Sequence, residues 1–263
     1  MIAPKNYSAA LAEFSSSKMR SFARPLRLFS GHDLPKLSMA RHLPAQARYQ
    51  SSSPGPNGRP KRIVVAVTGA TGSPLAVALL QRLRELDVET HLVMSKWGGA
   101  TLKYELEVPN NTTSYLESLA SVTHSSLDVS ASLSSGSFRT DGMIVVPCSM
   151  KTLAGIRMGY DNDLIVRAAS VTLKERRRLV LVARETPLTS IYLENMLEVT
   201  KAGAVVFPPV MAFYTRPSSI DDMVQQSVMR MIDLLDLEVI DGDMQDEARW
   251  SGFDWAAKGR QNA

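Results

Sequence analysis

The chain has 263 residues, of which 44% are hydrophobic, and its single cysteine, Cys148, excludes an internal disulfide and a cysteine-rich zinc site. The net charge of +4 does not indicate a nucleic-acid partner, because residues 1–60 hold nine Lys and Arg against two acids and the rest of the chain carries a net charge of −3. No apolar run is long enough to span a membrane, and only His91 and His124 lie beyond residue 60, so we expect neither a membrane span nor a metal site built on histidine.

Residues 1–60 have the composition of a mitochondrial presequence. They are rich in serine and arginine, contain few acids, and carry isolated Leu and Phe side chains instead of the continuous apolar run of a secretory signal. Pro and Gly punctuate residues 51–58, which we interpret as a linker. We therefore expect a targeting presequence and linker at 1–60, one folded domain at 61–250 and a tail at 251–263. The alternative for the first segment is a disordered arm without a targeting function.

From residue 61 onwards, short β-branched runs alternate with segments of helical periodicity. Strands that are apolar throughout and separated by helices indicate a parallel sheet covered on both faces. The expected fold class is therefore α/β, a doubly wound parallel sheet of the Rossmann or flavodoxin-like type in a single domain. The predicted strands are 62–67, 88–94, 143–146, 179–183 and 204–207, and the predicted helices are 75–86, 96–106, 113–120, 152–158, 164–177, 189–202 and 220–237.

The loop after the first predicted strand, TGATG at 68–72, opens a helix. Glycines let the backbone approach an anion and the helix N-terminus offers free N–H groups, so the loop favours a phosphate-bearing ligand over a tight turn that binds nothing. A nicotinamide dinucleotide fits less well, because Leu75 stands in place of the third glycine and Ser95 in place of the acid that holds the ribose. The chain also has no Tyr followed four residues later by Lys. We therefore expect a mononucleotide.

Polar side chains also follow the third and fifth predicted strands. After the third strand, Ser149 and Thr152 offer hydroxyls and Lys151 offers a charge at the start of another helix. We interpret Cys148 as a buried structural thiol rather than a nucleophile, since it ends an apolar strand and has no evident histidine partner. The fifth strand leads into a loop stiffened by prolines, which presents Tyr214 as part of a rigid wall.

Charged residues stand at further positions that call for a partner or a function. Arg184 and Glu185 directly follow the fourth predicted strand, where an unpaired charge would be costly to bury. Arg167 and Lys174 are two helical turns apart, on one face of the preceding helix. Residues 176–178, by contrast, are interpreted as a solvated basic stripe.

Taken together, these segments resemble the UbiX/Pad family of flavin prenyltransferases, long labelled phenylacrylic acid decarboxylases. The resemblance runs from residue 61 to about 250, and the leader together with SMK at 149–151 resembles the fungal, mitochondrial branch. Several blocks in order are far more specific than one glycine motif. The blocks are TGATG (68–72), THLVMSKWG (90–98), SSGSF (134–138), DGMIVVPCSMKTLAGI (141–156), RAASVTLKERR (167–177), RETPL (184–188), LENML (193–197), FPPVMAFYTRP (207–217) and RW (249–250).

The resemblance implies that the protein joins a dimethylallyl group, taken from dimethylallyl phosphate, to N5 and C6 of reduced FMN without a metal ion. The product, prenylated FMN, would serve a partner decarboxylase of the UbiD type, and the family forms dodecamers with active sites between subunits. The FMN contacts implied are Gly69, Ala70, Thr71, Ser95, Ser149, Met150, Lys151, Thr152 and Arg184. The substrate-phosphate contacts implied are Lys174, Tyr214 and Arg230, and the further active-site positions are Glu105, Arg167 and Glu185.

The chemistry of these residues is consistent with the implied roles. Ionisation of an allylic phosphate leaves a phosphate dianion and an allyl cation, and Lys174 with Arg230 would stabilise the dianion in place of Mg²⁺. Glu185 would protonate the leaving phosphate and Tyr214 would flank the cation. Thr71 would relay a proton after alkylation.

Three other functions are open at this point. A cysteine decarboxylase of the same flavoprotein fold would need a catalytic histidine near the flavin, and neither His91 nor His124 falls in a matching motif. A flavin-binding regulatory subunit of a phosphatase would be expected to carry a long acidic tail, and 13 residues follow Trp250 here. A direct decarboxylase of cinnamic-type acids would need a separate acid-binding site, for which the sequence offers no candidate.

Overall fold

The computed structural model describes residues 59–106 and 111–237. The tail and all but residues 59 and 60 of the predicted presequence and linker fall outside these ranges, so the domain boundaries stay predictions. The strands are β1 (Arg62–Val67), β2 (Glu89–Met94), β3 (Val122–Ser125), β4 (Gly142–Cys148), β5 (Arg178–Ala183) and β6 (Val205–Val206). The helices are α1 (Ser73–Glu85), α2 (Lys96–Glu105), α3 (Thr112–Leu119), α4 (Met150–Met158), α5 (Leu164–Lys174), α6 (Ser190–Lys201) and α7 (Ile220–Leu234), with a 3-10 turn, η2, at Ser132–Ser134.

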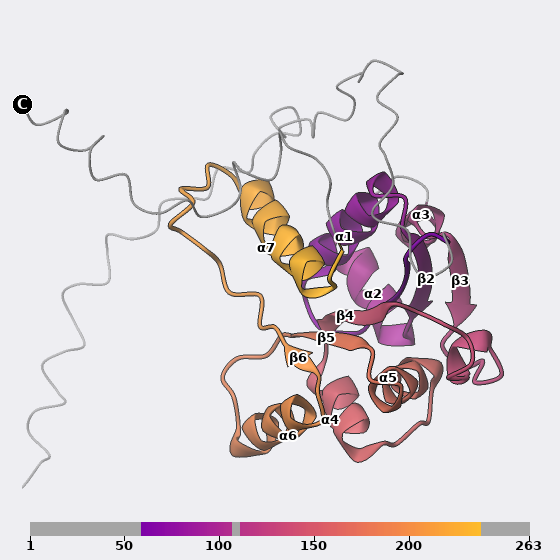
Figure 1. Ribbon diagram of the computed structural model, residues 1–263. Coiled ribbons are helices and arrows are strands. Elements are labelled where there is room, and N and C mark those ends of the chain that lie inside the picture. The colour runs from indigo at the N-terminus through magenta and orange to yellow at the C-terminus, as the bar shows by residue number, and fades with distance from the viewer. Residues whose placement is uncertain (1–58, 107–110, 238–263) are drawn as a thin grey trace, which may run out of the picture. The chain divides into compact units, whose positions relative to one another are not determined.

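The strands form one parallel sheet in the order β3-β2-β1-β4-β5-β6, with helices on both of its faces (Figure 1). The chain builds outward from β1 to β3 on one side and then returns to place β4 on the other side of β1. Parallel sheets bind ligands outside the carboxyl ends of the strands at such a reversal. The predicted doubly wound α/β fold is confirmed, and the reversal locates the expected site at the ends of β1 and β4.

Alternating side chains along β1 divide the core into two layers. Ile63, Val65 and Val67 pack with buried residues of α1, α3 and α7, whereas Val64 and Ala66 pack with buried residues of α4, α5 and α6. These five side chains are almost completely buried. The run RIVVAV is therefore apolar throughout because both faces of the strand are covered.

Three elements differ from the predictions by more than two residues, and one of them is α7, which ends at Leu234 rather than at Leu237. The edge strand β3 was not among the predicted strands, because its sequence VTHS holds a single apolar residue and an edge position needs little burial. Helix α5 ends at Lys174 rather than at Arg177, because Arg176 takes a left-handed backbone conformation (φ 55°) that starts the turn into β5. Within 59–106 and 111–237, the helices are all too short or too polar to cross a bilayer.

The close approach of α2 to the end of β1 depends on Gly98. A Cβ atom there would lie 2.5 Å from the carbonyl oxygen of Val67, whereas a Cβ at Gly99 would come no nearer than 3.8 Å to Met94 Sδ. We expect Gly98→Ala to lower the free energy of unfolding by about 1–3 kcal/mol. Gly99→Ala is expected to raise it by up to about 1 kcal/mol, because alanine is the better helix former. Urea unfolding of both variants measures the contrast, and changes of the same sign would contradict it.

Candidate active site

The carboxyl ends of β1, β2 and β4 are tied to one another by hydrogen bonds. The Thr68 hydroxyl donates to the carbonyl of Pro147 (2.7 Å) and accepts from the N–H of Ser149 (2.8 Å). The N–H of Ser95 donates to the carbonyl of Val67 (2.9 Å). These bonds fix the relative positions of the three strand ends that carry most of the predicted FMN contacts.

Ser95 and Ser149 cap the helices that follow them. Ser95 Oγ accepts from an N–H in the first turn of α2 (2.9 Å), and Ser149 Oγ accepts from the N–H of Thr152 (3.3 Å). The Ser95 hydroxyl still has its own hydrogen to donate to a ligand, whereas Ser149 Oγ also lies 3.1 Å from the hydroxyl oxygen of Thr152. In the first turn of α4, the side chain of Lys151 is exposed and that of Met150 is buried. The cap geometry therefore holds two predicted FMN hydroxyls in place beside a cation.

Glu105 bonds to the N-terminus of α1. Its carboxylate accepts from the N–H groups of Gly72 (3.1 Å) and Ser73 (2.8 Å) and from the side chain of Thr71. Burial raises the pKa of Glu105, but these hydrogen bonds outweigh burial and hold the pKa below its usual value. In this structure the N–H groups of Gly72 and Ser73 bond to a carboxylate of the protein, whereas the sequence analysis expected free N–H groups at this helix N-terminus. Two predicted catalytic residues, Thr71 and Glu105, are in contact.

The depressed pKa of Glu105 gives a pH-dependent expectation. A carboxyl group with a lowered folded-state pKa contributes stability above its unfolded pKa, near ~4.3, and loses that contribution as the pH falls through the folded value. We expect Glu105→Gln to lower the free energy of unfolding by about 0.5–2 kcal/mol at neutral pH, as for a lost helix cap. Below about pH 4, the difference between the two proteins should shrink. Denaturant unfolding at both pH values measures it, and a pH-independent difference would contradict the capping role.

Cys148 is completely buried at the end of β4. Burial raises the pKa of its thiol to about 12, so the group is a neutral thiol at physiological pH. A neutral, inaccessible thiol is a poor nucleophile. The structure thus supports the interpretation of Cys148 as part of the core.

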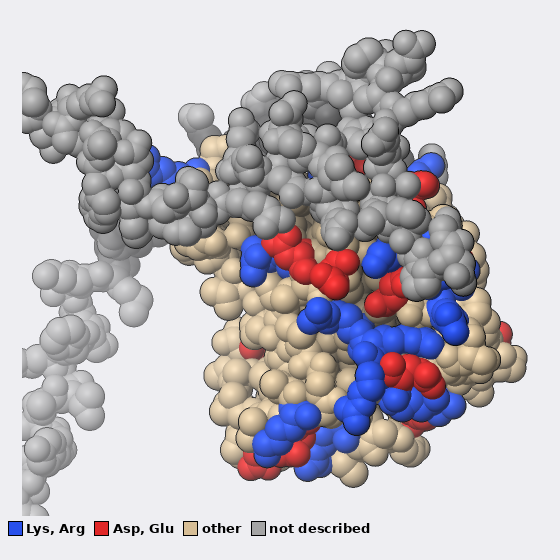
Figure 2. Space-filling view, in the orientation of Figure 1, with Lys and Arg blue, Asp and Glu red and all other residues tan. Residues whose placement is uncertain are grey.

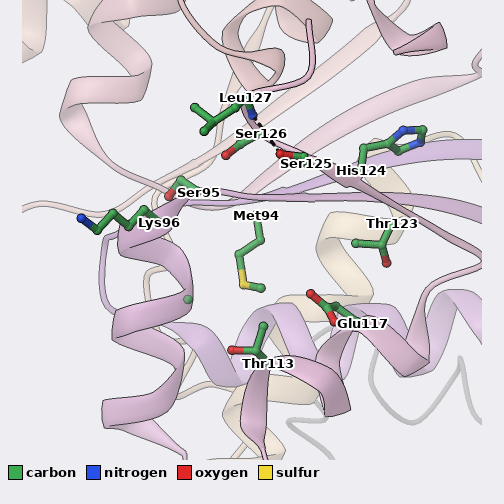
Figure 3. A pocket seen from close by; sticks show the side chains of 11 residues that line it. Met94, Ser95, Lys96, Thr113, Glu117, Thr123, His124, Ser125, Ser126 and Leu127 are labelled. Atoms are coloured by element: carbon green, nitrogen blue, oxygen red, sulfur yellow. Dashed lines mark hydrogen bonds between the residues drawn. The ribbon is translucent and has the colours of Figure 1, made fainter. Parts of the chain in front are cut away.

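A cavity of about 530 Å³ lies beside Ser95, among the ends of β2 and β3 and the helices α2 and α3 (Figure 3). Met94, Lys96, Glu117 and His124 contribute to its wall, and its volume is in the range of small-molecule sites. Ser95 is the one predicted FMN contact that lines it. The cavity therefore adjoins the predicted FMN site and does not contain it.

Arg184 and Glu185 extend the same edge of the sheet at the end of β5. The N–H of Arg184 donates to the carbonyl of Cys148 (3.2 Å), which fixes this segment beside the end of β4. Both side chains are exposed, and Glu185 Oε1 accepts from the N–H of Thr186 (3.0 Å). We call the residues that meet along this carboxyl edge the strand-end cluster. It consists of Gly69, Ala70, Thr71, Ser95, Glu105, Ser149, Met150, Lys151, Thr152, Arg184 and Glu185.

Lys174 lies towards the amino end of the strands, opposite the strand-end cluster. Helix α5 begins beside the end of β3, where the N–H of Leu164 donates to the carbonyl of Ser126 (2.8 Å), and ends just before β5 begins. The helix has 11 residues and is therefore about 16 Å long. Lys174 is its last residue, and the Lys174 ammonium pairs with Glu175 Oε1 at 2.5 Å. Within one chain, Lys174 and the strand-end cluster therefore lie at opposite ends of the strands.

Arg167 lies one turn into α5 and bonds to a neighbouring loop. Its Nη1 donates to Asp161 Oδ2 (2.9 Å) and its Nε donates to the carbonyl of Ser134 (3.1 Å). Asp161 also accepts from the hydroxyl of Ser170. Figure 2 shows basic and acidic side chains interleaved over the region that α5 occupies in Figure 1. The predicted pairing of Arg167 and Lys174 on one helix is present, and both side chains are already engaged with acids.

Arg177 does not belong to a solvated stripe, contrary to the prediction for 176–178. Its side chain is only 15% exposed and donates to the carbonyls of Gly136 (2.6 Å) and Phe138 (3.0 Å) and to the hydroxyl of Thr140 (3.3 Å). Its neighbours Arg176 and Arg178 are exposed, as predicted. The prediction failed for Arg177 because its partners lie 37 to 41 residues earlier in the chain. We call Arg167, Lys174, Glu175, Arg177 and the loop 134–138 the α5 cluster.

Tyr214 and Arg230 lie beyond β6, in the loop before α7 and on α7 itself. Thr215, which follows Tyr214, lines a cavity of about 510 Å³, and so does Glu85 at the end of α1. Thr71 lies at the other end of that helix, just before its start. Tyr214 is 52% exposed. Arg230 is exposed on α7, where its Nη1 donates to an aspartate three residues later (2.6 Å). The described side-chain contacts of Lys174 and Arg230 are with Glu175 and Asp233, and neither acid belongs to the strand-end cluster.

A chain of polar contacts joins the first three strands. Arg62 Nε donates to Glu89 Oε1 (2.8 Å), His91 Nε2 lies 3.0 Å from the same oxygen, and His91 Nδ1 lies 2.8 Å from His124 Nε2. Burial lowers the pKa of His124, and the adjacent His91 lowers it further. The part of the chain that the structure describes has no cluster of three or more His, Cys, Asp or Glu side chains suited to a metal ion. The two histidines are thus used in joining strands.

Comparison with known proteins identifies close relatives. The sequence matches the family described as Flavoprotein over residues 51–232. It is 62% identical over 176 residues to "Flavin prenyltransferase PAD1, mitochondrial" of Saccharomyces cerevisiae, covering 66% of this chain and 71% of that protein. It is 47% identical over 193 residues to "Flavin prenyltransferase UbiX" of Escherichia coli strain K12, covering 73% of this chain and 99% of that protein.

Two solved structures are similar over their full length. AnUbiX (PadA1) in complex with FMN and dimethylallyl pyrophosphate has a TM-score of 0.69 and 59% identity, covering 74% of this chain and 100% of that chain. A dodecameric FMN-dependent Ubix-like decarboxylase from Escherichia coli O157:H7 has a TM-score of 0.67 and 52% identity, covering 73% of this chain and 100% of that chain. Both sequence identities are high enough to indicate more than a shared fold.

Proposed function

We propose that this chain, which belongs to the Flavoprotein family, is a flavin prenyltransferase. Such an enzyme joins a dimethylallyl group to N5 and C6 of reduced FMN and produces prenylated FMN. One observation carries this conclusion. Over 74% of its length, the chain is 59% identical to the whole of a solved protein that holds FMN and dimethylallyl pyrophosphate together. Other relatives of similar identity are named flavin prenyltransferases.

The strand-end cluster has the groups that FMN requires. Ser95 and Ser149 offer fixed hydroxyls, and Lys151 and Arg184 offer exposed cations for the flavin phosphate and carbonyls. A Cβ at Gly69 would lie 2.6 Å from Trp97 Cβ, so the loop can hold this close path only with glycine. Reduced FMN supplies two nucleophilic atoms, N5 and C6. We propose that the cluster binds FMN and orients these atoms towards the allylic substrate.

In the proposed transfer, Lys174, Arg230 and Glu185 act on the leaving phosphate. Loss of an allylic phosphate places a second negative charge on its oxygens, and the ammonium of Lys174 and the guanidinium of Arg230 would stabilise that charge. Glu185 would donate a proton to the phosphate, and Tyr214 would present its ring to the allyl cation. Thr71, bonded to Glu105, would pass on the proton released from the flavin. Fixed charges replace a metal ion in this scheme.

We propose that the active site is shared between subunits of a homo-oligomer, which we expect to be a dodecamer. Lys174 lies at the amino end of the sheet and the strand-end cluster at the carboxyl end, so a neighbouring subunit is needed to bring them together. Large apolar side chains that a monomer would leave in water are consistent with further contacts. Among them are Trp97 (68% exposed), Val210 (77%), Phe213 (69%) and Ile191 (64%). A solved relative is named as dodecameric.

The setting in the cell is a further proposal. The composition of residues 1–60 supports a mitochondrial location, as does the name of the yeast relative. Prenylated FMN would pass to a UbiD-type decarboxylase, so any effect of this protein on decarboxylation of aromatic or cinnamic acids would be indirect.

Mass spectrometry of the flavin tests the proposed function. The full chain is incubated without oxygen with reduced FMN and either dimethylallyl phosphate or the diphosphate. The flavin released after denaturation should be heavier by one C5 unit in at least one of the two reactions. Recovery of unmodified FMN alone from both reactions would contradict the proposal.

A further inference from the structure

We propose that Arg177 is a positioning residue for the allylic substrate: it fixes the loop 134–138 and thereby the place at which Lys174 meets the phosphate. The inference rests on the proposed function and assigns a role to a residue that lies outside the set expected from the sequence. Arg177 touches neither FMN nor substrate in this scheme. It acts through the loop.

The contacts of Arg177 are those of a clamp. Nη2 donates to the carbonyl of Gly136 (2.6 Å), while Nη1 donates to the carbonyl of Phe138 (3.0 Å) and the hydroxyl of Thr140 (3.3 Å). A guanidinium holds its donors in a rigid plane, so three bonds to one segment fix that segment's position and orientation. Arg167 holds the preceding part of the same loop through the carbonyl of Ser134 (3.1 Å). Two arginines of one cluster thus anchor the loop.

The clamped loop in turn limits where Lys174 can lie. A Cβ atom built on Gly136 would be 2.7 Å from Lys174 Nζ and 2.0 Å from Glu175 Oε1, so the glycine backbone is in immediate contact with this ion pair. Glu175 bonds to Lys174 through Oε1, and its Oε2 lies 4.0 Å from Arg177 Nη2. The Lys174 ammonium is therefore held between the loop and a carboxylate whose other oxygen faces Arg177. Release of the loop would let the ammonium move.

The positioning role is tested by measuring how tightly the allylic substrate binds when no turnover takes place. This measurement distinguishes a positioning residue from a residue that supports the structure in general. Dimethylallyl diphosphate is titrated into the assembled protein loaded with oxidised FMN, and steady-state constants are measured with reduced FMN. We expect Arg177→Gln to weaken diphosphate binding and raise KM about 10- to 100-fold, as for lost charged hydrogen bonds, with FMN affinity unchanged. Arg177→Lys should recover part of the loss, because it keeps the charge but not the planar fork.

Arg176→Gln is the matched control. It removes the same charge one residue earlier, from an exposed side chain that makes no hydrogen bond or ion pair among the described contacts, and it should behave as wild type. If Arg177→Gln fails to assemble, Gly136→Ala tests the claim from the loop. Its Cβ would displace the flexible ends of Lys174 and Glu175 and should produce the same selective weakening.

Two results would overturn the positioning role. One is unchanged diphosphate binding in Arg177→Gln, or in Gly136→Ala where that variant is used. The other is an equal loss of FMN and diphosphate binding. Failure of the proposed function would look different, since wild-type protein would then yield unmodified FMN whatever the variants do.

Discussion

A Lys174→Ala variant is expected to bind reduced FMN as tightly as wild type and to transfer the dimethylallyl group about 10²- to 10³-fold more slowly, as when a preorganised group that stabilises transition-state charge is removed. Lys174 lies on α5, away from the strand-end cluster of its own chain, so its loss leaves the FMN contacts intact. The leaving phosphate would lose a fixed positive charge at the moment when its own charge increases. Single-turnover transfer and FMN titration measure the two effects.

Lys201→Ala provides the control for loss of an exposed lysine. Lys201 pairs with Glu198 at 2.8 Å and is 60% exposed, close to the 52% of Lys174. The control should transfer at the wild-type rate. Equal rates for Lys174→Ala and Lys201→Ala would refute the role of Lys174, and so would a parallel loss of FMN binding.

Glu185→Gln is expected to retain FMN and to slow transfer about 10²- to 10⁴-fold, the range for removal of a general acid. The substitution keeps the shape of the side chain, and the amide oxygen can still accept the bond from the N–H of Thr186. It removes the proton that would neutralise the leaving phosphate. Stopped-flow measurement of single turnovers determines the effect. Glu194→Gln, an exposed substitution on α6, is the control, and a Glu185→Gln rate equal to it would contradict the assignment.

The sheet could be predicted from sequence because its central strands are apolar on both faces. The runs at β1, β4 and β5 are buried almost from end to end, and each predicted strand has a counterpart in the structure. β3 was not predicted because Thr123, His124 and Ser125 are polar. This edge strand is held by its backbone pairing with β2 and by contacts such as that of His91 with His124. Periodicity detects burial and gives no signal for such a strand.

The composition of the strand-end cluster was also predictable, because the carboxyl ends of parallel strands meet at one edge. The contacts within it were not. The resemblance placed Glu105 in the active site, but its bonds to the N–H groups of Gly72 and Ser73 depend on how α2 packs against α1. Sequence spacing carries no information on contacts between helices.

The α5 cluster shows a second limit of sequence reasoning. Charged residues in a row, as in Glu175 to Arg178, usually face water, and Arg176 and Arg178 do. Arg177 differs because the turn after α5 directs it towards carbonyls of a loop about 40 residues upstream. The helical spacing of Arg167 and Lys174 indicated a shared face. That Lys174 lies at the amino end of the strands, opposite the strand-end cluster, follows only from the topology of the sheet.

The shared active site is the central claim, and mixed oligomers of two inactive variants test it most directly. Glu185→Gln keeps an intact α5 cluster, and Lys174→Ala keeps an intact strand-end cluster. Each variant is given a different tag, the two are co-expressed, and oligomers that carry both tags are isolated. Random mixing in equal amounts pairs an intact strand-end cluster with an intact α5 cluster in about a quarter of the sites of a symmetric assembly. We predict that the mixed oligomers regain about that fraction of wild-type prenylation; oligomers no more active than either parent would contradict a site built from two subunits.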